Sequence, residues 1–344
     1  MALLEARDLT IGLKREGEFL KAVDNISFEI EAGEILGLAG ESGCGKSLTA
    51  LSIPGLLPRT AKVLSGETMF KLAQGTSVSL TALGEKELCS VRGKEISIIF
   101  QEARQCLNPL LRAGAQIAET LELHAFKGNK EKLALDMLAR LGFTEPEKVY
   151  GAFPHQLSGG MCQRVMIAIA AICRPRLLIA DEPTTALDEA NQEQILSLLL
   201  EINREYGTAI LFISHDLTFV QKFCHRVMVM YAGKIVEEGP AQSLLSSPLH
   251  PYTKGLIGAI PTREQKGRPL ANIPGRIPSI WDTFPGCRFA PRCPAQLAAE
   301  HKLAQCIAAF PPARDLGNGH RVCCYLTEPA ANSGNPQPNG GRND

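Results

Sequence analysis

The stretch Gly40-Glu41-Ser42-Gly43-Cys44-Gly45-Lys46-Ser47 decides the fold, because it fits the P-loop pattern G-x-x-x-x-G-K-S/T at every required position. The run before it, residues 35–39, is apolar and unbroken, which is typical of a parallel strand buried on both faces. Residues 47–56 read as a helix that ends before Pro58. The motif therefore has the strand–loop–helix context that the pattern requires.

The residue types in this loop suit a triphosphate and its magnesium ion. Gly40, Gly43 and Gly45 let the backbone turn tightly and aim its N–H groups at an anion. The start of the following helix adds its positive end. Lys46 can place its charge on the β- and γ-phosphates, and the Ser47 hydroxyl can ligate Mg²⁺.

The composition limits the class of protein. The chain has 344 residues, 45% hydrophobic and 21% charged, so we expect a packed core with one large domain and an appendage, or two domains. Its 36 Lys and Arg balance 36 Asp and Glu, which argues against a strongly basic nucleic-acid binder. No apolar run reaches the ~18–20 residues that span a bilayer. Residues 1–8 lack the features of a signal peptide, so we expect a cytoplasmic chain.

Two adjacent carboxylates follow a second apolar strand. Residues 177–180 lead directly into Asp181 and Glu182. Beside a P-loop, Asp181 is placed to hold Mg²⁺, and Glu182 is placed to polarise a water molecule for attack on the γ-phosphate. An ordinary acidic pair at the end of a strand is the alternative, and the P-loop upstream argues against it.

Two more polar residues follow predicted strands. Gln101 comes after the strand at residues 96–100, where it could touch Mg²⁺ or the attacking water, although a solvated loop glutamine gives the same pattern. His215 follows the strand at residues 209–214, and ligands collect at the carboxyl ends of strands in open α/β sheets. We expect His215 to contact the γ-phosphate, with a structural histidine as the alternative.

The remaining segments predict the framework. Strands are expected at residues 3–11 and 22–30, and a closing hairpin at 226–231 and 234–239. Helices are expected at residues 85–91, 113–141, 165–172 and 191–206. The helical pattern within residues 102–172 reads as an insertion that either packs or docks a partner. Ser158-Gly159-Gly160, before an apolar helix, offers a second phosphate site, although this tripeptide alone is a common turn.

Together these motifs resemble the ABC ATPases. Six motifs of that family have counterparts here, in the same order and spacing. They are the Walker A motif (residues 40–47), the Q-loop (Gln101), the signature (157–160), the Walker B motif (177–182), the D-loop (186–188) and the H-loop (His215). Residues 107–109, 158–164 and 247–253 resemble, more narrowly, the ATP-binding subunits of oligopeptide, dipeptide and nickel importers, and the tail at residues 286–294 supports this independently. The resemblance covers residues 3–260. It implies an ATPase coupled to transmembrane transport, with an antiparallel β subdomain and a helical subdomain around the P-loop core.

The resemblance also implies partners. A second ABC ATPase chain, identical or homologous, would complete a head-to-tail sandwich, with each ATP between one P-loop and Ser158, Gly159 and Gly160 of the other chain. Closure and hydrolysis would drive two transmembrane permease subunits, to which an extracytoplasmic solute-binding protein delivers the solute. The chain would be the peripheral motor of a translocase at the cytoplasmic face of the inner membrane. Peptides are favoured as the solute; nickel and other solutes remain open.

The same resemblance implies roles for single residues. ATP would be bound by Gly40, Glu41, Ser42, Gly43, Cys44, Gly45, Lys46 and Ser47. The catalytic residues would be Glu182, His215 and Gln101, and the Mg²⁺ ligands Ser47, Gln101 and Asp181. The family's adenine-stacking aromatic falls near Gly17, so that Phe19 is the nearest candidate, with a loop or core role as the alternative.

Eleven cysteines are distributed unevenly along the chain. Six lie singly before residue 225, as expected for reduced cysteines that act as small hydrophobes. The other five lie within residues 261–328, a Pro- and Gly-rich stretch. It is expected to form a small lobe that needs a covalent or metal cross-link, because it can bury little core of its own. The spacing Cys287-x5-Cys293-x12-Cys306-x17-Cys324 resembles the peptide-importer tail that binds a 4Fe–4S cluster. Tetrahedral zinc and cysteines that are unmetallated or disulfide-linked remain alternatives.

Two competing functions remain to be weighed. A soluble ABC ATPase acting in DNA repair or on ribosomes usually carries long coiled-coil inserts or two ATPase cores in one chain, and neither pattern occurs in this sequence. A non-hydrolysing nucleotide switch conflicts with intact Asp181, Glu182 and His215. The prediction is therefore an α/β P-loop NTPase at residues 3–260, a Cys-rich domain at 261–328, and a disordered tail at 329–344.

Overall fold

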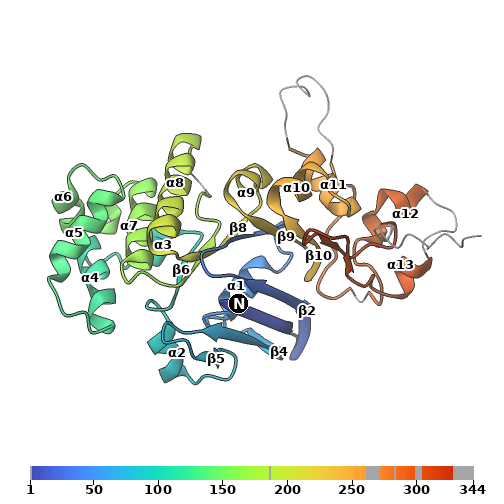
Figure 1. Ribbon diagram of the computed structural model, residues 1–344, viewed down its shortest axis with the longest axis horizontal. Helices are drawn as coiled ribbons and strands as arrows, with labels where there is room; N and C mark the ends of the chain where they lie inside the picture. The colour runs from blue at the N-terminus through green and yellow to red at the C-terminus, as the bar shows by residue number, and fades with distance from the viewer. Residues whose placement is uncertain (1, 186, 261–271, 283, 299–303, 328–344) are drawn as a thin grey trace, which may run out of the picture.

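The computed structural model describes residues 2–185, 187–260, 272–282, 284–298 and 304–327, so the predicted tail at 329–344 lies outside the described residues. The larger β-sheet carries the strands that precede the predicted motifs (Figure 1). Its parallel strands are β6 (Ile96–Ile99), β7 (Leu177–Asp181), β8 (Ala209–Ser214), β3 (Ile35–Ala39) and β9 (Arg226–Tyr231), adjacent in that order. Their carboxyl ends therefore meet at one edge of the sheet.

The sheet continues beyond β9 with antiparallel strands. The hairpin of β9 and β10 (Lys234–Pro240) confirms the prediction for this region. β12 (Arg321–Val322) pairs with β10, and β11 (Arg314–Asp315) pairs with β12. Residues close to the C-terminus thus complete the edge of the sheet that carries the P-loop strand.

A second, antiparallel sheet covers one face of the first. It has the order β2-β1-β4-β5 and consists of β1 (Leu4–Arg15), β2 (Glu18–Ile30), β4 (Ala61–Lys71) and β5 (Ser77–Ser79). Along β7, Leu177 and Ile179 pack toward this sheet, whereas Leu178 and Ala180 pack toward helices on the other face. Burial on both faces explains why the motif strands are unbroken apolar runs.

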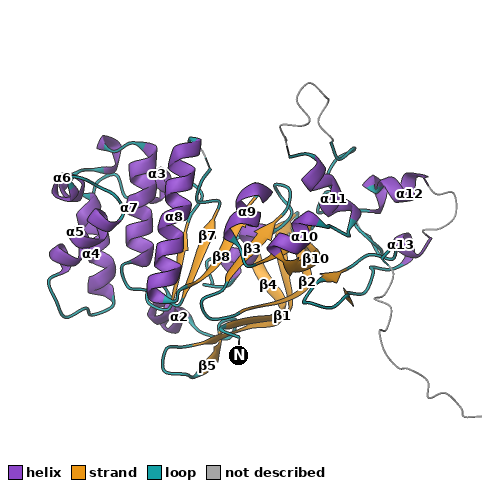
Figure 2. Cartoon of the chain, turned by 45° about the horizontal axis from the view of Figure 1, so that its top comes forward, coloured by secondary structure: helices purple, strands orange, loops and turns teal. Residues whose placement is uncertain are grey.

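Helices cover the opposite face and one end of the main sheet (Figure 2). Between β6 and β7 lie α3 (Ala103–Cys106), α4 (Ala113–Leu123), α5 (Lys130–Arg140), α6 (Pro146–Gly151), η1 (Pro154–Gln156) and α7 (Gly159–Ala171). The others before residue 260 are α1 (Lys46–Ser52), α2 (Glu85–Val91), α8 (Glu189–Tyr206), α9 (Leu217–Phe223), α10 (Ala241–Ser246) and α11 (Pro251–Gly258). The P-loop helix is shorter than predicted because Pro54 has no N–H to continue it.

The C-terminal part contains short elements, namely η3 (Ala290–Arg292), α12 (Pro294–Ala298) and α13 (Ala304–Ala308). Phe289 is 1% exposed and belongs to the same hydrophobic cluster as Tyr231 of β9 and Tyr252 of α11. This part of the chain therefore packs against β9, the strand next to the P-loop strand, and against α11. None of the helices within the described ranges is long and apolar enough to cross a membrane.

Candidate functional site

The P-loop lies between β3 and α1 in a conformation that only glycine fits well. Gly40 has φ 152°, and a Cβ atom there would lie 2.2 Å from the carbonyl oxygen of Met230. Gly45, the residue before α1, has φ 111°. Both positions therefore exclude a side chain, because the loop lies against β9 and turns through the left-handed region. Lys46 follows at once and is only 5% exposed.

The ammonium of Lys46 lies against the loop. Its Nζ donates hydrogen bonds to the carbonyl oxygens of Gly40, at 2.8 Å, and Glu41, at 3.0 Å. The loop carbonyls thus hold the positive charge at the place where phosphate oxygens of a nucleotide would compete for it. The contact of Lys46 with the β- and γ-phosphates stays a prediction.

The predicted magnesium ligands of the loop and of β7 are adjacent. The Ser47 hydroxyl donates a hydrogen bond to the Asp181 carboxylate. Asp181 is 7% exposed, and its Oδ1 atom is buried without a hydrogen-bond partner within the described residues. Burial raises the pKa of Asp181, an effect that the Ser47 hydrogen bond only partly opposes. A buried carboxylate oxygen left unpaired beside a serine hydroxyl fits a divalent cation, which supplies the missing charge.

The three predicted catalytic side chains meet at the carboxyl ends of β6, β7 and β8. Oε2 of Glu182 accepts hydrogen bonds from Gln101 Nε2, at 3.1 Å, and from Thr185 Oγ1, at 2.9 Å. His215 Nδ1 lies 3.3 Å from the same oxygen. Glu182 has φ 48°, a strained conformation for a residue with a side chain, and strain of this kind clusters at functional sites.

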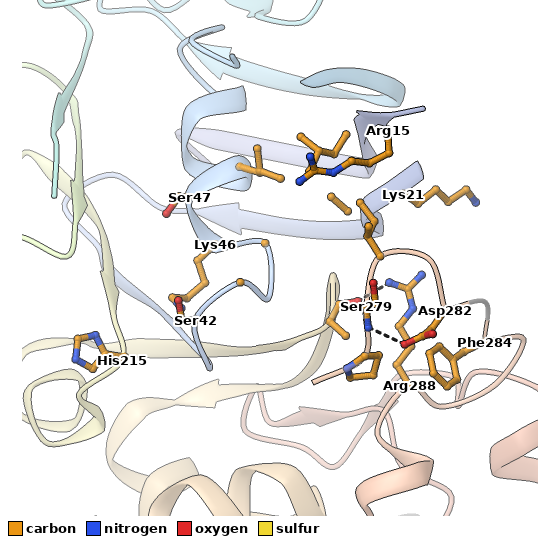
Figure 3. A pocket seen from close by; sticks show the side chains of 18 of the residues that line it. Arg15, Lys21, Ser42, Lys46, Ser47, His215, Ser279, Asp282, Phe284 and Arg288 are labelled. Atoms are coloured by element: carbon orange, nitrogen blue, oxygen red, sulfur yellow. Dashed lines mark hydrogen bonds between the residues drawn. The ribbon is translucent and has the colours of Figure 1, made fainter. Parts of the chain in front are cut away.

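These residues and the P-loop line one cavity of about 770 Å³ (Figure 3). Ser42, Gly43, Gly45, Lys46, Ser47, Gln101, Glu182 and His215 all contribute to its wall. This volume lies in the usual range for small-molecule and cofactor sites. The structure thus brings together the P-loop and the three catalytic candidates, although they are scattered over about half of the chain.

The opposite wall of the cavity was not found from the sequence. It consists of Leu13, Arg15, Lys21 and Ala22 from β1 and β2 and of Pro278, Ser279, Ile280, Asp282, Phe284 and Arg288 from the C-terminal part. Figure 3 shows Phe284 and Arg288 on a C-terminal loop, with Arg15 above them. Phe19 is absent from this wall, and Lys62 Nζ lies 4.1 Å from the centre of its ring. The nearest sequence candidate for an adenine contact therefore lies elsewhere.

Ser158, Gly159 and Gly160 are not part of this cavity. Ser158 caps α7, and its hydroxyl accepts a hydrogen bond from the Met161 N–H at 3.3 Å. A Cβ atom on Gly159 would meet no atom within 4 Å, so the start of α7 is open. Of the predicted D-loop, Asp188 caps α8, whereas Ala186 lies outside the described residues.

Comparison with known proteins agrees with this geometry. The family model described as ABC transporter matches residues 23–185, and the model described as oligopeptide/dipeptide transporter, C-terminal region, matches residues 236–299. A probable peptide ABC transporter ATP-binding protein of Sinorhizobium fredii is 42% identical, with 96% of each chain covered. The chain belongs to the ATP-binding proteins of ABC transporters. It is therefore an ABC ATPase, and the resemblance inferred from its motifs is confirmed.

Other members of this ABC family extend the comparison. The dipeptide transport ATP-binding protein DppD of Escherichia coli is 39% identical over 98% of this chain and 99% of its own. The oligopeptide transport ATP-binding protein AppD of Bacillus subtilis is 42% identical over 95% and 97%. Among solved structures, the ATP-binding cassette MJ0796, a dimer with ADP and Pi, has 29% identity and a TM-score of 0.61, covering 70% of this chain and 99% of its own. The P-loop ABC ATPase fold is confirmed.

The four cysteines predicted to hold a cluster lie around one small buried cavity of this ABC ATPase. Cys287, Cys293, Cys306 and Cys324 all line it, and all eleven cysteines are free thiols, which argues against disulfides. Burial raises the pKa of Cys287 to about 12. Among the described residues, however, no three His, Cys, Asp or Glu side chains are grouped so that they could hold a metal ion. The thiols share a cavity without being in ligating positions.

Proposed function

We propose that this chain is the ATP-hydrolysing subunit that energises the import of di- or oligopeptides through a membrane ABC transporter. The observation that carries the proposal is the meeting of Gln101, Glu182 and His215 in the wall of the cavity that the P-loop also lines. Peptide transport is supported by the names of relatives that match nearly the whole chain. The C-terminal match to oligopeptide/dipeptide transporters points to the same solutes.

The cavity suggests how the reaction is performed. The N–H groups of residues 40–47 and the Lys46 ammonium bind the phosphates of ATP. Ser47, Asp181 and Gln101 would hold Mg²⁺, which neutralises charge on the phosphoryl group. Glu182 accepts the proton of the attacking water, while Gln101 and His215 orient it and the γ-phosphate.

The position of Ser158, Gly159 and Gly160 outside the cavity bears on the partners of this chain. Ser158, Gly159 and Gly160 lie outside it at an open helix start, which supports a role on the nucleotide of a second ABC ATPase subunit. The dimeric state of the solved relative supports the same arrangement. We assign residues 3–260 to the ATP-binding domain and its helices within 102–172 to a helical subdomain facing two transmembrane permease subunits. The chain would lie at the cytoplasmic face of the inner membrane, in a system with an extracytoplasmic solute-binding protein.

Residues 261–328 would form a Cys-rich lobe that holds a 4Fe–4S cluster at Cys287, Cys293, Cys306 and Cys324. The shared cavity supports this proposal, although the thiols would have to move into ligating positions. Such a cluster would cross-link a lobe with little core of its own. Iron, zinc and acid-labile sulfide should be measured in protein purified without oxygen. Four iron and four sulfide per chain support the cluster, and zinc alone supports the zinc alternative. Protein that contains neither iron nor zinc would contradict both.

The test of the function is uptake by vesicles that contain the reconstituted permeases, the binding protein and both ATPase subunits. A labelled dipeptide and Ni²⁺ should be offered separately, with ATP and with a non-hydrolysable analogue. ATP-dependent peptide uptake supports the proposal, and uptake of Ni²⁺ alone identifies a nickel importer. A chain that never sediments with membranes containing its permeases would contradict a transport role and favour a soluble ABC ATPase.

A further inference from the structure

The segment at residues 287–293 carries two arginines, Arg288 and Arg292, that reach the P-loop from the C-terminal part of the chain. Both lie within residues 286–294, part of the tail that resembles peptide importers, but the sequence assigned no role to either arginine. The side chain of Arg292 is 5% exposed and that of Arg288 is 17% exposed. Long cationic side chains are rarely buried unless they are paired, so their partners indicate what the segment does.

Arg292 forms a two-point ion pair with Glu41, the second residue of the P-loop. Its Nη1 donates to Glu41 Oε2 at 2.9 Å, and its Nη2 donates to Oε1 at 3.3 Å. The guanidinium also donates to the carbonyl oxygens of Pro274, at 2.8 Å, and Ile273, at 3.1 Å, and to the Tyr231 hydroxyl at 3.3 Å. A planar guanidinium with this many partners is fixed in direction as well as position.

Glu41 in turn connects this pair to the phosphate-binding lysine. Its backbone N–H donates to the Tyr252 hydroxyl at 2.8 Å, and its carbonyl accepts from Lys46 Nζ at 3.0 Å. The ring of Tyr252 packs 5.4 Å from that of Phe289, which lies within the 287–293 segment. A displacement of Glu41 would therefore move a carbonyl oxygen that accepts a hydrogen bond from Lys46.

Arg288 contacts the β9–β10 turn, which in turn contacts the P-loop. It donates to the carbonyl oxygen of Ala232 in the β9–β10 turn, and its Nη2 donates to the Asp24 carboxylate at 2.8 Å. The next residue of that turn, Gly233, donates its N–H to the carbonyl of Cys44 at 2.8 Å. Arg292 thus contacts the second residue of the P-loop directly, whereas Arg288 is linked to the fifth, Cys44, through the β9–β10 turn.

We propose that Arg292, assisted by Arg288, is a positioning residue of the P-loop, so that the 287–293 segment sets the affinity of this chain for ATP. The proposal rests on the proposed function, since it presupposes that the P-loop binds ATP. It gives the C-terminal part a role in nucleotide binding that is separate from any metal that its cysteines hold.

The experiment measures the Kd for ATP of the full chain by titration calorimetry, with unfolding temperature recorded in parallel. The variants are Arg292→Gln, Arg292→Lys, Glu41→Gln and the double variant Arg292→Gln/Glu41→Gln. The matched control is Arg321→Gln, because Arg321 lies in the same C-terminal part but pairs with Glu238 and is 44% exposed. Lys46→Ala shows whether the chain binds ATP through its P-loop at all.

We expect Arg292→Gln and Glu41→Gln each to weaken ATP binding at least about tenfold, which corresponds to about 1.4 kcal/mol. The double variant should bind ATP less than about twofold more weakly than either single variant, because both changes break the same interaction. Arg292→Lys keeps the charge but loses the two-point hydrogen bonding of the guanidinium, so its Kd for ATP should lie between those of the wild type and Arg292→Gln. The Kd of Arg321→Gln should match that of the wild type. If Arg292→Gln does not fold, Arg292→Lys and Glu41→Gln decide by the same criteria.

Two results would overturn the proposal. In the first, Arg292→Gln or its substitutes bind ATP as the wild type does while the unfolding temperature falls, which would make the ion pair a purely structural contact. In the second, Arg292→Gln and Glu41→Gln have fully additive effects. Failure of the wild type itself to bind ATP, or binding that survives Lys46→Ala, would instead contradict the proposed function.

Discussion

Replacing Glu182 by glutamine is the sharpest test of the catalytic assignment. Glu182 Oε2 accepts the hydrogen bonds of Gln101 and Thr185 and lies beside His215, and none of these contacts uses Oε1. A glutamine amide oxygen can occupy the Oε2 position and keep both hydrogen bonds, so the fold should persist. The amide nitrogen at the Oε1 position cannot accept a proton. A general base contributes about 10²–10⁴-fold to a rate, or about 2.7–5.4 kcal/mol in the activation barrier.

The assay is phosphate release by the reconstituted transporter at saturating ATP, together with the ATP affinity of the purified chain. Glu182→Gln should lower the hydrolysis rate by at least about 10²-fold while Kd for ATP stays within about twofold. Glu193→Gln makes the same chemical change at an exposed position of α8 and should leave the rate unchanged. A Glu182→Gln transporter that hydrolyses ATP within about tenfold of the wild type would refute the assignment of Glu182 as the base.

Three further predictions concern the cavity. Lys46→Ala should abolish ATP binding measured by calorimetry, because it removes the ammonium held at the mouth of the loop; retained micromolar affinity would contradict this. Because burial raises the pKa of Asp181 above its ordinary 3.8, its ionisation opposes folding, and the wild type loses stability as the pH rises through the interval between the unfolded and folded pKa. Asp181→Asn should therefore unfold at a higher temperature than the wild type at pH 7.5 without Mg²⁺, while losing hydrolysis, and the difference should vanish at pH 3; an unchanged or lower unfolding temperature at pH 7.5 would contradict the burial argument. Phe284→Ala should weaken ATP binding by about 5-fold to 150-fold, since base–aromatic stacking contributes about 1–3 kcal/mol, and Phe19→Ala should not; the reverse order of effects in a fluorescent-nucleotide displacement assay would place the base at Phe19.

Several features could be read from local sequence because each depends on a short stretch. The P-loop strand and the strands before Asp181 and His215 are apolar on both faces, so they were recognisable without the rest of the chain. Polar residues that directly follow such strands lie at the carboxyl edge of a parallel sheet. The meeting of Gln101, Glu182 and His215 could therefore be expected before any distance was known.

Local sequence was less informative about element ends. The helical pattern at residues 113–141 divides into α4 and α5, and the chain reverses at Ala125, which has φ 54°. Periodicity could not locate this break, because the apolar positions on both sides belong to one buried cluster. The helix after the P-loop likewise ends early, at Ser52, before Pro54.

The sequence by itself determined the nucleotide-binding fold, the phosphate loop and the identity of the catalytic candidates, because those depend on backbone conformation and on residues next to a strand. Only the tertiary structure decided what forms the opposite wall of the cavity and what holds the P-loop in place. Arg292 and Glu41 lie about 250 residues apart, and their contact depends on how the C-terminal part packs against β9 and α11. No local propensity encodes such a contact, since the burial that makes it strong arises only when both surfaces have come together.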